Sequence, residues 1–394
     1  MADGDATRWM LTEDARTWAA KHDTPPARAR FESIGLRLPE TRRTTQELMA
    51  STRHRTHVDL ERLTGIHERR IAGPGEDSFS LAVDAARDCL AHSRHDASDI
   101  EMLVNTSISR SHGDATLRIE PPLSLFVKEA IGATDAVSFD LSNACAGMTT
   151  GVLLLDNFIR RGEIERGMVV SGEYISHLAT NAAAVMHTIA SRQLASLTVG
   201  DAGAAVIVER APEGCPGISV AAFTTLCEHS RLCLAYPSRT SRGGNMFTKA
   251  RALQRAAMED ASPLVREALA SAGLHASDID WFIPHQTSAR AIRKGARQFE
   301  QHGVLPPHNI VCNVEHFGNT SSNSHFVALY RYLEEERFRD GDRIMLVALA
   351  SGIVVGAIIF TMDELRERYG SGDRSRGHRD LGGLTETAGR APAG

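Results

Sequence analysis

ASDIEMLVNTSI at residues 97–108 and ASDIDWFIPHQTS at residues 276–288 are two copies of one pattern, separated by 179 positions. In each copy the run ASDI and an acidic residue lead into a short apolar strand. A helical stretch precedes both copies, at 81–93 and at 263–274. Apolar strands that alternate with amphipathic helices are typical of a sheet covered by helices.

The match continues beyond these copies. Residues 153–173 and 327–351 both read as helix, turn and strand, and a Val/Ile-rich strand follows each, at 201–209 and 352–361. Continuous Val/Ile-rich strands are typical of sheets that are buried on both faces. A repeat of this length is too long for a solenoid unit. The sequence therefore predicts a duplicated α/β fold.

The two predicted halves cover about residues 28–210 and 216–366, and the ends of the chain differ from them. Residues 1–27 show no clear strand or core pattern, so we expect an N-terminal extension. Residues 370–394 hold seven glycines and almost no large apolar side chains. We expect a disordered tail there. The insert at 225–250 is expected to be a flexible loop near the substrate tunnel.

Charge and cysteine content limit the class of protein. The 394 residues have a formal net charge of −5, from 44 basic and 49 acidic side chains, so no basic excess favours nucleic-acid binding. No secretory signal begins the chain, and no apolar run reaches the length of about 18 residues that spans a bilayer. The six cysteines show no CxxC spacing and predict neither a disulfide scaffold nor a metal site. We expect a cytoplasmic protein with no membrane or nucleic-acid partner.

Cys145 is the candidate nucleophile. It lies in FDLSNACAGMTTG, where a strand at 136–141 leads through small residues into an apolar helix. The helix dipole and the free amides at such a turn favour a thiolate. Small neighbours leave room for a substrate carbonyl to approach. The alternative is an inert buried cysteine.

His285 and Asn319 are candidate partners of this cysteine. His285 ends the strand at 281–285, and Asn319 lies in a strand-to-helix turn like that of Cys145. At a repeat offset of about 176, Cys145 falls opposite Ser321, two residues after Asn319. A cysteine can take an acyl group from a thioester, while two neutral donors stabilise the enolate of a second thioester. The alternatives are a structural histidine and a turn asparagine.

Six motifs in a fixed order then give about residues 28–366 a resemblance to β-ketoacyl-acyl-carrier-protein synthase III, of the thiolase-like superfamily. They are IGLRLPE (34–40), TGIHERRIA (64–72), DLSNACAGMTTG (140–151), GDAGAAVIV (200–208), IPHQTSAR (283–290) and FGNTSSNS (317–324). The resemblance implies a duplicated five-layered αβαβα sandwich that works as a homodimer. It implies acylation of Cys145 and catalytic roles for His285 and Asn319. The backbone amides of Cys145 and Gly352 would form the oxyanion hole.

The resemblance also bears on the acyl donor. Arg290 matches the arginine at the mouth of the pantetheine tunnel, and Arg293 and Lys294 follow on the same predicted helix. A basic face would suit an acidic carrier protein, and an ordinary solvated face is the alternative. In many relatives a tryptophan and an arginine just before TGI hold the adenine of coenzyme A. Asp59 and Leu63 stand there in this chain, which favours a carrier-protein donor over acyl-CoA.

Glu120 is a second departure from the family pattern. The typical synthase has an apolar residue here, which reaches across the dimer into the acyl pocket of the partner. A glutamate resembles the one found in thiolase-like enzymes that condense two long acyl chains head to head, and in pyrone-forming ketosynthases, where it removes a proton from the second substrate. Desolvation would raise its pKa and make it a better base. The alternative is a shifted loop, with Glu120 in solvent.

We therefore expect an acyltransferase of the ketosynthase type, in specialised fatty acid or polyketide biosynthesis. An acyl group on Cys145 would be condensed with a malonyl or β-ketoacyl thioester, without a metal or other cofactor. One alternative is condensation without decarboxylation, with Glu120 as base. Another is transfer of the acyl group to an alcohol or amine, and a third is a non-catalytic partner subunit.

Overall fold

A computed structural model describes residues 8–10, 27–54, 58–113, 117–188, 190–304 and 309–369, without the side chains of residues 8–10 and 260. The predicted tail at 370–394 and most of the predicted extension at 1–27 lie outside the described residues.

Two five-stranded sheets form the frame of the molecule. The first has the order β2-β8-β7-β5-β6 and the second the order β1-β9-β14-β13-β12. The strands of the first sheet are β2 (Ala29–Arg37), β5 (Met102–Asn105), β6 (Val137–Asp140), β7 (Arg166–Glu173) and β8 (Ala202–Arg210). Those of the second are β1 (Arg8–Met10), β9 (Ile218–Thr225), β12 (Trp281–Pro284), β13 (Arg343–Ala350) and β14 (Val354–Thr361).

The two sheets repeat one topology. β5 pairs parallel to β7 as β12 pairs parallel to β13, and β7–β8 and β13–β14 are both antiparallel. β8 then pairs antiparallel to β2, as β14 does to β9. The duplicated α/β fold predicted from the repeat is confirmed. β1 adds a strand at the edge of the second sheet, within a segment where the sequence predicted none.

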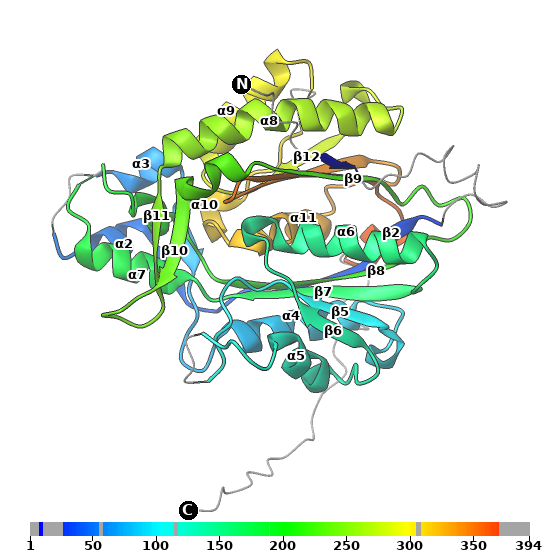
Figure 1. The fold of residues 1–394 in the computed structure, drawn as a ribbon, viewed down its shortest axis with the longest axis horizontal. Helices are drawn as coiled ribbons and strands as arrows, with labels where there is room; N and C mark the ends of the chain where they lie inside the picture. Colours follow the sequence, from blue (N-terminus) through cyan, green and yellow to red (C-terminus); the bar gives the residue numbers. More distant parts are fainter. Residues whose placement is uncertain are drawn as a thin grey trace, which may run out of the picture.

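The helices form three layers around these sheets. In Figure 1, α8 and α9 cover the outer face of the second sheet, α6 and α11 lie between the sheets, and α4 and α5 cover the outer face of the first. The αβαβα sandwich is therefore confirmed. The helices are α2 (Thr45–Ala50), α3 (Leu60–Thr64), α4 (Ser78–Ala91), α5 (Leu123–Ile131), α6 (Gly147–Arg160), α7 (Ser176–Val185), α8 (Ala250–Ser271), α9 (Ala289–Gln301), α10 (Val314–Phe317) and α11 (Ser324–Glu334). In the described ranges, no helix combines the length and apolar character that crossing a bilayer requires.

The central helices α6 and α11 are buried because a sheet covers them on each side. Met148 and Leu155 of α6 and Phe326 and Leu329 of α11 are fully buried in one core that both sheets share. Helices with this much buried surface are apolar around most of their circumference. This core places the N-terminal ends of both helices at the centre of the molecule, where the candidate residues lie.

Three glycines let α4 lie unusually close to the first sheet. A Cβ atom on Gly35, Gly172 or Gly203 would come within 2.0 Å of a carbonyl oxygen of α4. Real Cβ atoms do not approach oxygen so closely, so only glycine fits at these strand positions. The glycines therefore fix the distance between this helix and strands β2, β7 and β8.

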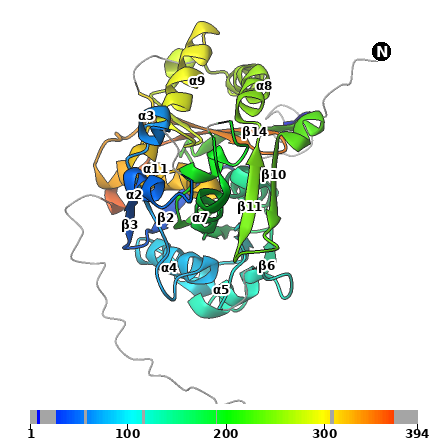
Figure 2. The same ribbon diagram turned by 90° about the vertical axis from the view of Figure 1, so that its left-hand side faces the viewer.

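The insert at 225–250 is ordered, and the expectation of a flexible loop is wrong. It contains a 3₁₀ turn at Cys227–Leu232 and the antiparallel hairpin β10 (Cys233–Pro237) and β11 (Gly244–Thr248). Figure 2 shows the hairpin standing beside α7, and Asn181 of α7 donates to the carbonyl oxygen of Gly244 at 2.8 Å. The hairpin thus follows β9 of the second sheet and packs on a helix of the N-terminal half.

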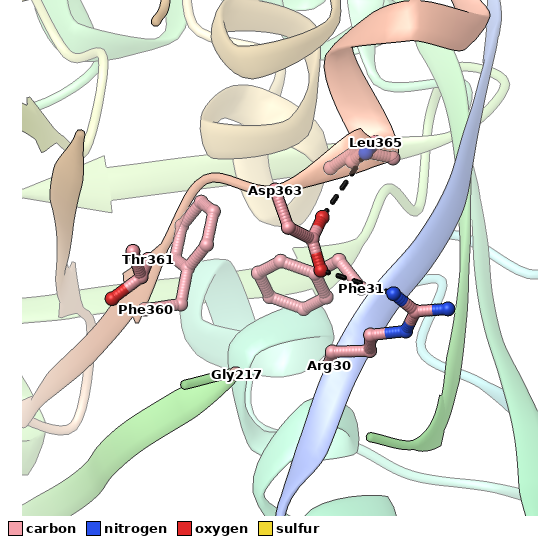
Figure 3. A pocket seen from close by; sticks show the side chains of 7 residues that line it. All are labelled: Arg30, Phe31, Gly217, Phe360, Thr361, Asp363 and Leu365. Atoms are coloured by element: carbon pink, nitrogen blue, oxygen red, sulfur yellow. Dashed lines mark hydrogen bonds and ion pairs between the residues drawn. The ribbon is translucent and has the colours of Figure 1, made fainter. Parts of the chain in front are cut away.

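The end of the described chain is fastened to β2. The Tyr369 hydroxyl accepts from the Ile34 amide at 2.5 Å and donates to the Ile34 carbonyl at 2.6 Å. Figure 3 shows a hollow lined by residues of β2 and of the chain after β14, where Arg30 pairs with Asp363 at 3.3 Å and the Leu365 amide donates to the same carboxylate. The Tyr369 hydroxyl thus satisfies both backbone groups of Ile34 on the outer edge of β2, which has β8 on one side only.

Candidate active site

Cys145 lies where the first sheet meets the central helix layer. It follows β6 in a 3₁₀ turn at Ala144–Ala146 that continues directly into α6. Ala144 has a positive φ of 47°, which turns the chain sharply before the cysteine. The Ser321 hydroxyl donates to the Cys145 sulfur at 3.6 Å, across the boundary between the two halves. The predicted strand-turn-helix setting of Cys145 is therefore present.

The ionisation state of this thiol differs from the expectation. Burial raises the pKa of Cys145 to about 12, and the Ser321 hydrogen bond opposes this rise only in part. We expected the helix start to favour a thiolate, and that expectation is wrong because burial outweighs the effect of the helix start. Burial therefore favours the protonated thiol of Cys145 over the thiolate.

The turn of the second half has the same geometry. A 3₁₀ turn at Ser321–Asn323 runs into α11, and its first residue, Ser321, has a φ of 55°. Because Ala144 and Ser321 share this backbone conformation, the structural counterpart of Cys145 is Ser322. The sequence repeat placed Ser321 opposite Cys145, one residue away from this result.

His285 is buried directly after β12, in a setting that favours the neutral ring. The Gln286 amide donates weakly to the Ser324 hydroxyl at 3.5 Å, and this hydroxyl lies 2.7 Å from His285 Nδ1. The hydroxyl can therefore donate to Nδ1, and in that tautomer the ring proton is on Nε2. Burial, with a smaller contribution from His325, lowers the pKa of His285 to about 3.

We expect the His285 ring to remain neutral, with its proton on Nε2, from about pH 5 to about pH 8. Its pKa in the folded protein lies below the ordinary value of 6.5, so acid protonates the unfolded chain first and lowers stability as the pH falls below 6.5. Nitrogen-15 NMR of the histidine rings would measure this. A His285 signal that titrates between pH 6 and pH 7 would contradict the assignment.

Asn319 is oriented by its own turn. Its side-chain oxygen accepts from the Ser321 amide at 2.9 Å, and its backbone bonds to Thr198 and Gly200 at 2.8 and 3.0 Å. The amide nitrogen Nδ2 is left as the donating end of the side chain. Asn319 can therefore donate to a carbonyl oxygen without rearranging.

One six-residue stretch, which we call the serine turn (residues 319–324), connects the three candidates. It contains Asn319, contacts Cys145 through Ser321, and contacts His285 through Ser324. The structure thus brings together the three residues that the sequence predicted. The sequence analysis assigned no role to the serines, although the run NTSSNS at 319–324 is unusually polar for the start of a buried helix.

Gly352 lies in the turn between β13 and β14, and both strands pack against the 3₁₀ turn of Cys145. Its backbone has a φ of 138°, which is favourable only for glycine. This location is compatible with the expected oxyanion hole, which stays a prediction.

Glu120 is not joined to these residues. It is exposed on the loop before α5, and the described part of this single chain contains no contact between Glu120 and Cys145. Its neighbour Ile119 has an exposed fraction of 76%, unusual for an isoleucine. The expected role of Glu120 as a base stays a prediction, and it would require a second copy of the chain.

The predicted basic face is a stripe on α9. Arg290, Arg293, Lys294 and Arg297 are all exposed and follow helical spacing, and we call them the basic stripe. Arg293 pairs with Glu315 at 2.8 Å. The neighbouring helix α3 is capped by Asp59, whose carboxylate accepts from the Arg62 amide at 2.9 Å. The side chain of Asp59 is thus engaged in capping its own helix.

Comparison with known proteins agrees with this geometry. Two sequence profiles match, "3-Oxoacyl-[acyl-carrier-protein (ACP)] synthase III" at residues 139–225 and its C-terminal counterpart at residues 269–362. A β-ketoacyl-[acyl-carrier-protein] synthase III of Rhodospirillum centenum is 30% identical over 85% of this chain and 99% of its own length.

Solved structures show the same fold. OleA of Xanthomonas campestris, with bound lauric acid and lauroyl-CoA, superposes with a TM-score of 0.74 at 22% identity, over 85% of this chain and 99% of its own. The synthase III of Aquifex aeolicus gives a TM-score of 0.72 at 22% identity, over 85% of this chain and 100% of its own. A priming β-ketosynthase of a polyketide pathway gives 0.72 at 25% identity, over 86% and 98%.

The sandwich fold and the cysteine turn at its centre define a thiolase-fold condensing enzyme, which is a transferase of the acyltransferase type. Within that class, the chain belongs to the β-ketoacyl-acyl-carrier-protein synthase III family.

Proposed function

We propose that the enzyme catalyses a decarboxylative Claisen condensation, in which an acyl group held on Cys145 is joined to a malonyl thioester. The observation that supports this most directly is the serine turn, which contains Asn319 and contacts both Cys145 and His285. On this proposal the half at 28–210 supplies the nucleophile and the half at 216–366 supplies the two donors.

The first step acylates the enzyme. The Cys145 sulfur attacks the carbonyl carbon of an acyl thioester, the carbon–sulfur bond of the donor breaks, and the departing thiolate takes up the proton that Cys145 loses. The amides of Cys145 and Gly352 are proposed to stabilise the oxyanion of the tetrahedral intermediate.

The second step forms the carbon–carbon bond. The malonyl thioester loses CO2, and the electrons of the broken bond form an enolate. His285 Nε2 and Asn319 Nδ2 donate to the enolate oxygen. The enolate carbon attacks the acyl carbonyl on Cys145 and expels the cysteine thiolate, which is protonated again.

Alanine in place of His285 or Asn319 should separate these steps. Condensation should fall by about 10²–10³-fold for each variant, because one donor to the enolate is removed. Acylation of Cys145 should persist, since it needs neither donor. Intact mass measures the acyl-enzyme and CO2 release measures the second step. His275→Ala, at an exposed histidine, is the control, and equal losses in both steps would contradict the assignment.

A second candidate is condensation without loss of CO2, with Glu120 as the base. Glu120 and its exposed neighbours Ile119 and Leu117 lie where a second copy of the chain would have to cover apolar surface. On this candidate the carboxylate removes the α-proton of a second acyl or β-ketoacyl thioester bound in the partner.

One experiment tests the proposal against its alternatives. Purified enzyme receives an acyl thioester and malonyl-carrier protein, and CO2 and products are followed together by mass spectrometry. CO2 with a β-ketoacyl product supports the decarboxylative proposal, with Glu120→Gln equally active. Joined acyl thioesters without CO2, lost in Glu120→Gln, support the second candidate. Acyl transfer to an added alcohol or amine, or no acyl-enzyme at all, would overturn both.

We also propose that the enzyme is a homodimer. β6 is an edge strand of the first sheet, and its first residue, Val137, has an exposed fraction of 62%. Ile119, Leu117 and Leu125, also exposed, lie in and next to the loop before α5. An open apolar edge is a pairing surface that native proteins cover. Analytical ultracentrifugation should give twice the chain mass, and Val137→Lys should weaken that dimer.

The basic stripe is proposed to bind an acyl carrier protein, in preference to acyl-CoA. We expect Lys294→Glu with Arg297→Glu to raise KM for a carrier-protein substrate by about tenfold, because charge complementarity guides docking. KM for the matching acyl-CoA should stay within about twofold. Arg161→Glu is the control, because the Arg161 side chain has an exposed fraction of 66% and lies outside the basic stripe. Equal KM changes for both substrates would show that the stripe does not recognise the carrier.

A further inference from the structure

Glu173 is a buried carboxyl at the centre of the molecule that the proposed reaction does not use. It is the last residue of β7 and is completely inaccessible to solvent. Its Oε1 accepts from the Ser322 hydroxyl at 2.6 Å and from the Ile108 amide at 3.2 Å. Its Oε2 accepts weakly from the amide and hydroxyl of Ser109, at 3.5 and 3.4 Å.

This carboxyl is costly for the fold. In the described part of the chain, no arginine, lysine or histidine forms an ion pair with Glu173. Burial raises its pKa to about 7, although these hydrogen bonds oppose the rise. A core carboxyl without a counter-ion destabilises a protein, and an apolar residue would serve packing better. A role in positioning the residues of the candidate active site would explain why a carboxyl stands at this buried position.

The short hydrogen bond to Ser322 leads directly into the site. Ser322 is part of the serine turn and is the structural counterpart of Cys145 in the second half. Its hydroxyl also lies 2.9 Å from that of Ser171 on β7. On one side of it Ser321 donates to the Cys145 sulfur, and on the other Ser324 lies against His285. Glu173 therefore binds the middle of the serine turn, between the serines that contact Cys145 and His285.

We propose that Glu173 is a positioning residue for the condensation, which holds the serine turn through Ser322 in the geometry that the nucleophile and the donors need. This inference rests on the proposed function of Cys145, His285 and Asn319. Glu173 touches neither substrate nor sulfur, so it acts through Ser322.

The charge of Glu173 gives the proposal a second consequence. Burial is the main cause of the high pKa of the Cys145 thiol, and the nearby Glu173 carboxylate raises that pKa further. Removing the charge while keeping the hydrogen bond should make the thiol more acidic. Removing the hydrogen bond while keeping the charge should disturb the geometry alone. Glu173→Gln and Ser322→Ala separate the two effects.

The first measurement needs no substrate. Cys145 is alkylated with iodoacetamide at about pH 8.5, where the Glu173 carboxyl is largely ionised, and mass spectrometry identifies the modified cysteine. We expect Glu173→Gln to speed the alkylation of Cys145 by about threefold, because a thiolate forms more easily without the neighbouring charge. Glu32→Gln, at another completely buried carboxyl, should leave the rate unchanged.

The second measurement is steady-state condensation. Glu173→Ala and Ser322→Ala should each lower kcat by about 10- to 100-fold with little change in KM, since misplaced groups slow the chemical step. Glu173→Gln should restore most of kcat, because its amide oxygen can accept from Ser322. Thermal unfolding of each variant separates misfolding from misplacement.

The outcomes are distinct for the two proposals. Unchanged alkylation in Glu173→Gln together with an unchanged kcat in Ser322→Ala would overturn the positioning role. A kcat that falls in Glu32→Gln as far as in Glu173→Ala would show that any buried carboxyl has this effect, and would also overturn it. A wild-type enzyme that forms no acyl-Cys145 would refute the proposed function, while the alkylation rates would still test the placement of Glu173.

Discussion

Replacing Cys145 by alanine is expected to abolish acyl-enzyme formation and to lower condensation by at least about 10³-fold. The sulfur is the only atom in the proposed mechanism that carries the acyl group, and Ser321 already donates to it at 3.6 Å. Burial raises the pKa of this thiol, so the sulfur has to lose its proton in the course of the proposed attack. Incubation with an acyl thioester, followed by intact mass, measures the acyl-enzyme directly.

Cys215→Ala is the matched control for this experiment. Cys215 is also a free, partly buried cysteine, but it lies beside Asp363, at the C-terminal end of β14. The Cys215→Ala variant should form the acyl-enzyme on Cys145 and turn over substrate at the rate of the wild type. An acyl group found on any other residue of the Cys145→Ala protein would contradict the assignment, as would turnover that survives the substitution. Cys145→Ser should keep the site folded while it reacts far more slowly.

Gly203→Ala is expected to have the largest effect on stability, about 3 kcal/mol of unfolding free energy, through overpacking. The added Cβ would lie 2.0 Å from the carbonyl oxygen of Leu81 in α4 and 2.7 Å from its carbon. Both are backbone atoms of a helix that also packs on Gly35 and Gly172, so α4 cannot move away at one point alone. Urea unfolding followed by circular dichroism measures the change.

Gly295→Ala is the opposite case and serves as the control. Gly295 lies inside α9, has an ordinary helical backbone, and its nearest neighbour for an added Cβ is the Met258 sulfur at 3.6 Å. Alanine favours a helix over glycine by about 1 kcal/mol, so this variant should be as stable as the wild type or more so. Equal urea midpoints for Gly203→Ala and the wild type would show that α4 is free to move.

The fold could be predicted from the sequence because the signals were local and occurred twice. Each ASDI copy is followed by the expected strand, one in each sheet. The expected helix, turn and strand are also present in both halves, at 153–173 and at 327–351. The positions of Cys145, His285 and Asn319 were also recognisable, because each one follows a strand or lies at the start of a helical turn.

Features that depend on distant contacts were not predictable in this way. The β10–β11 hairpin packs on α7, and no pattern within residues 225–250 indicates that contact with a distant helix. Glu173 ends an ordinary apolar strand, and its hydrogen-bond partner Ser322 is 149 residues away. The acidity of Cys145 was misjudged because a helix start is visible in the sequence, whereas the burial that outweighs it is not.

The fastening of Tyr369 to Ile34 has a consequence for protein synthesis. The two residues are 335 positions apart, so a ribosome that adds about 5–20 residues per second releases them about 20–70 s apart. During that interval the outer edge of β2 lacks its last partner, and an open strand edge invites pairing with other chains. The backbone groups of Ile34 therefore gain this partner only when synthesis is nearly finished, and a chain truncated before Tyr369 would never gain it.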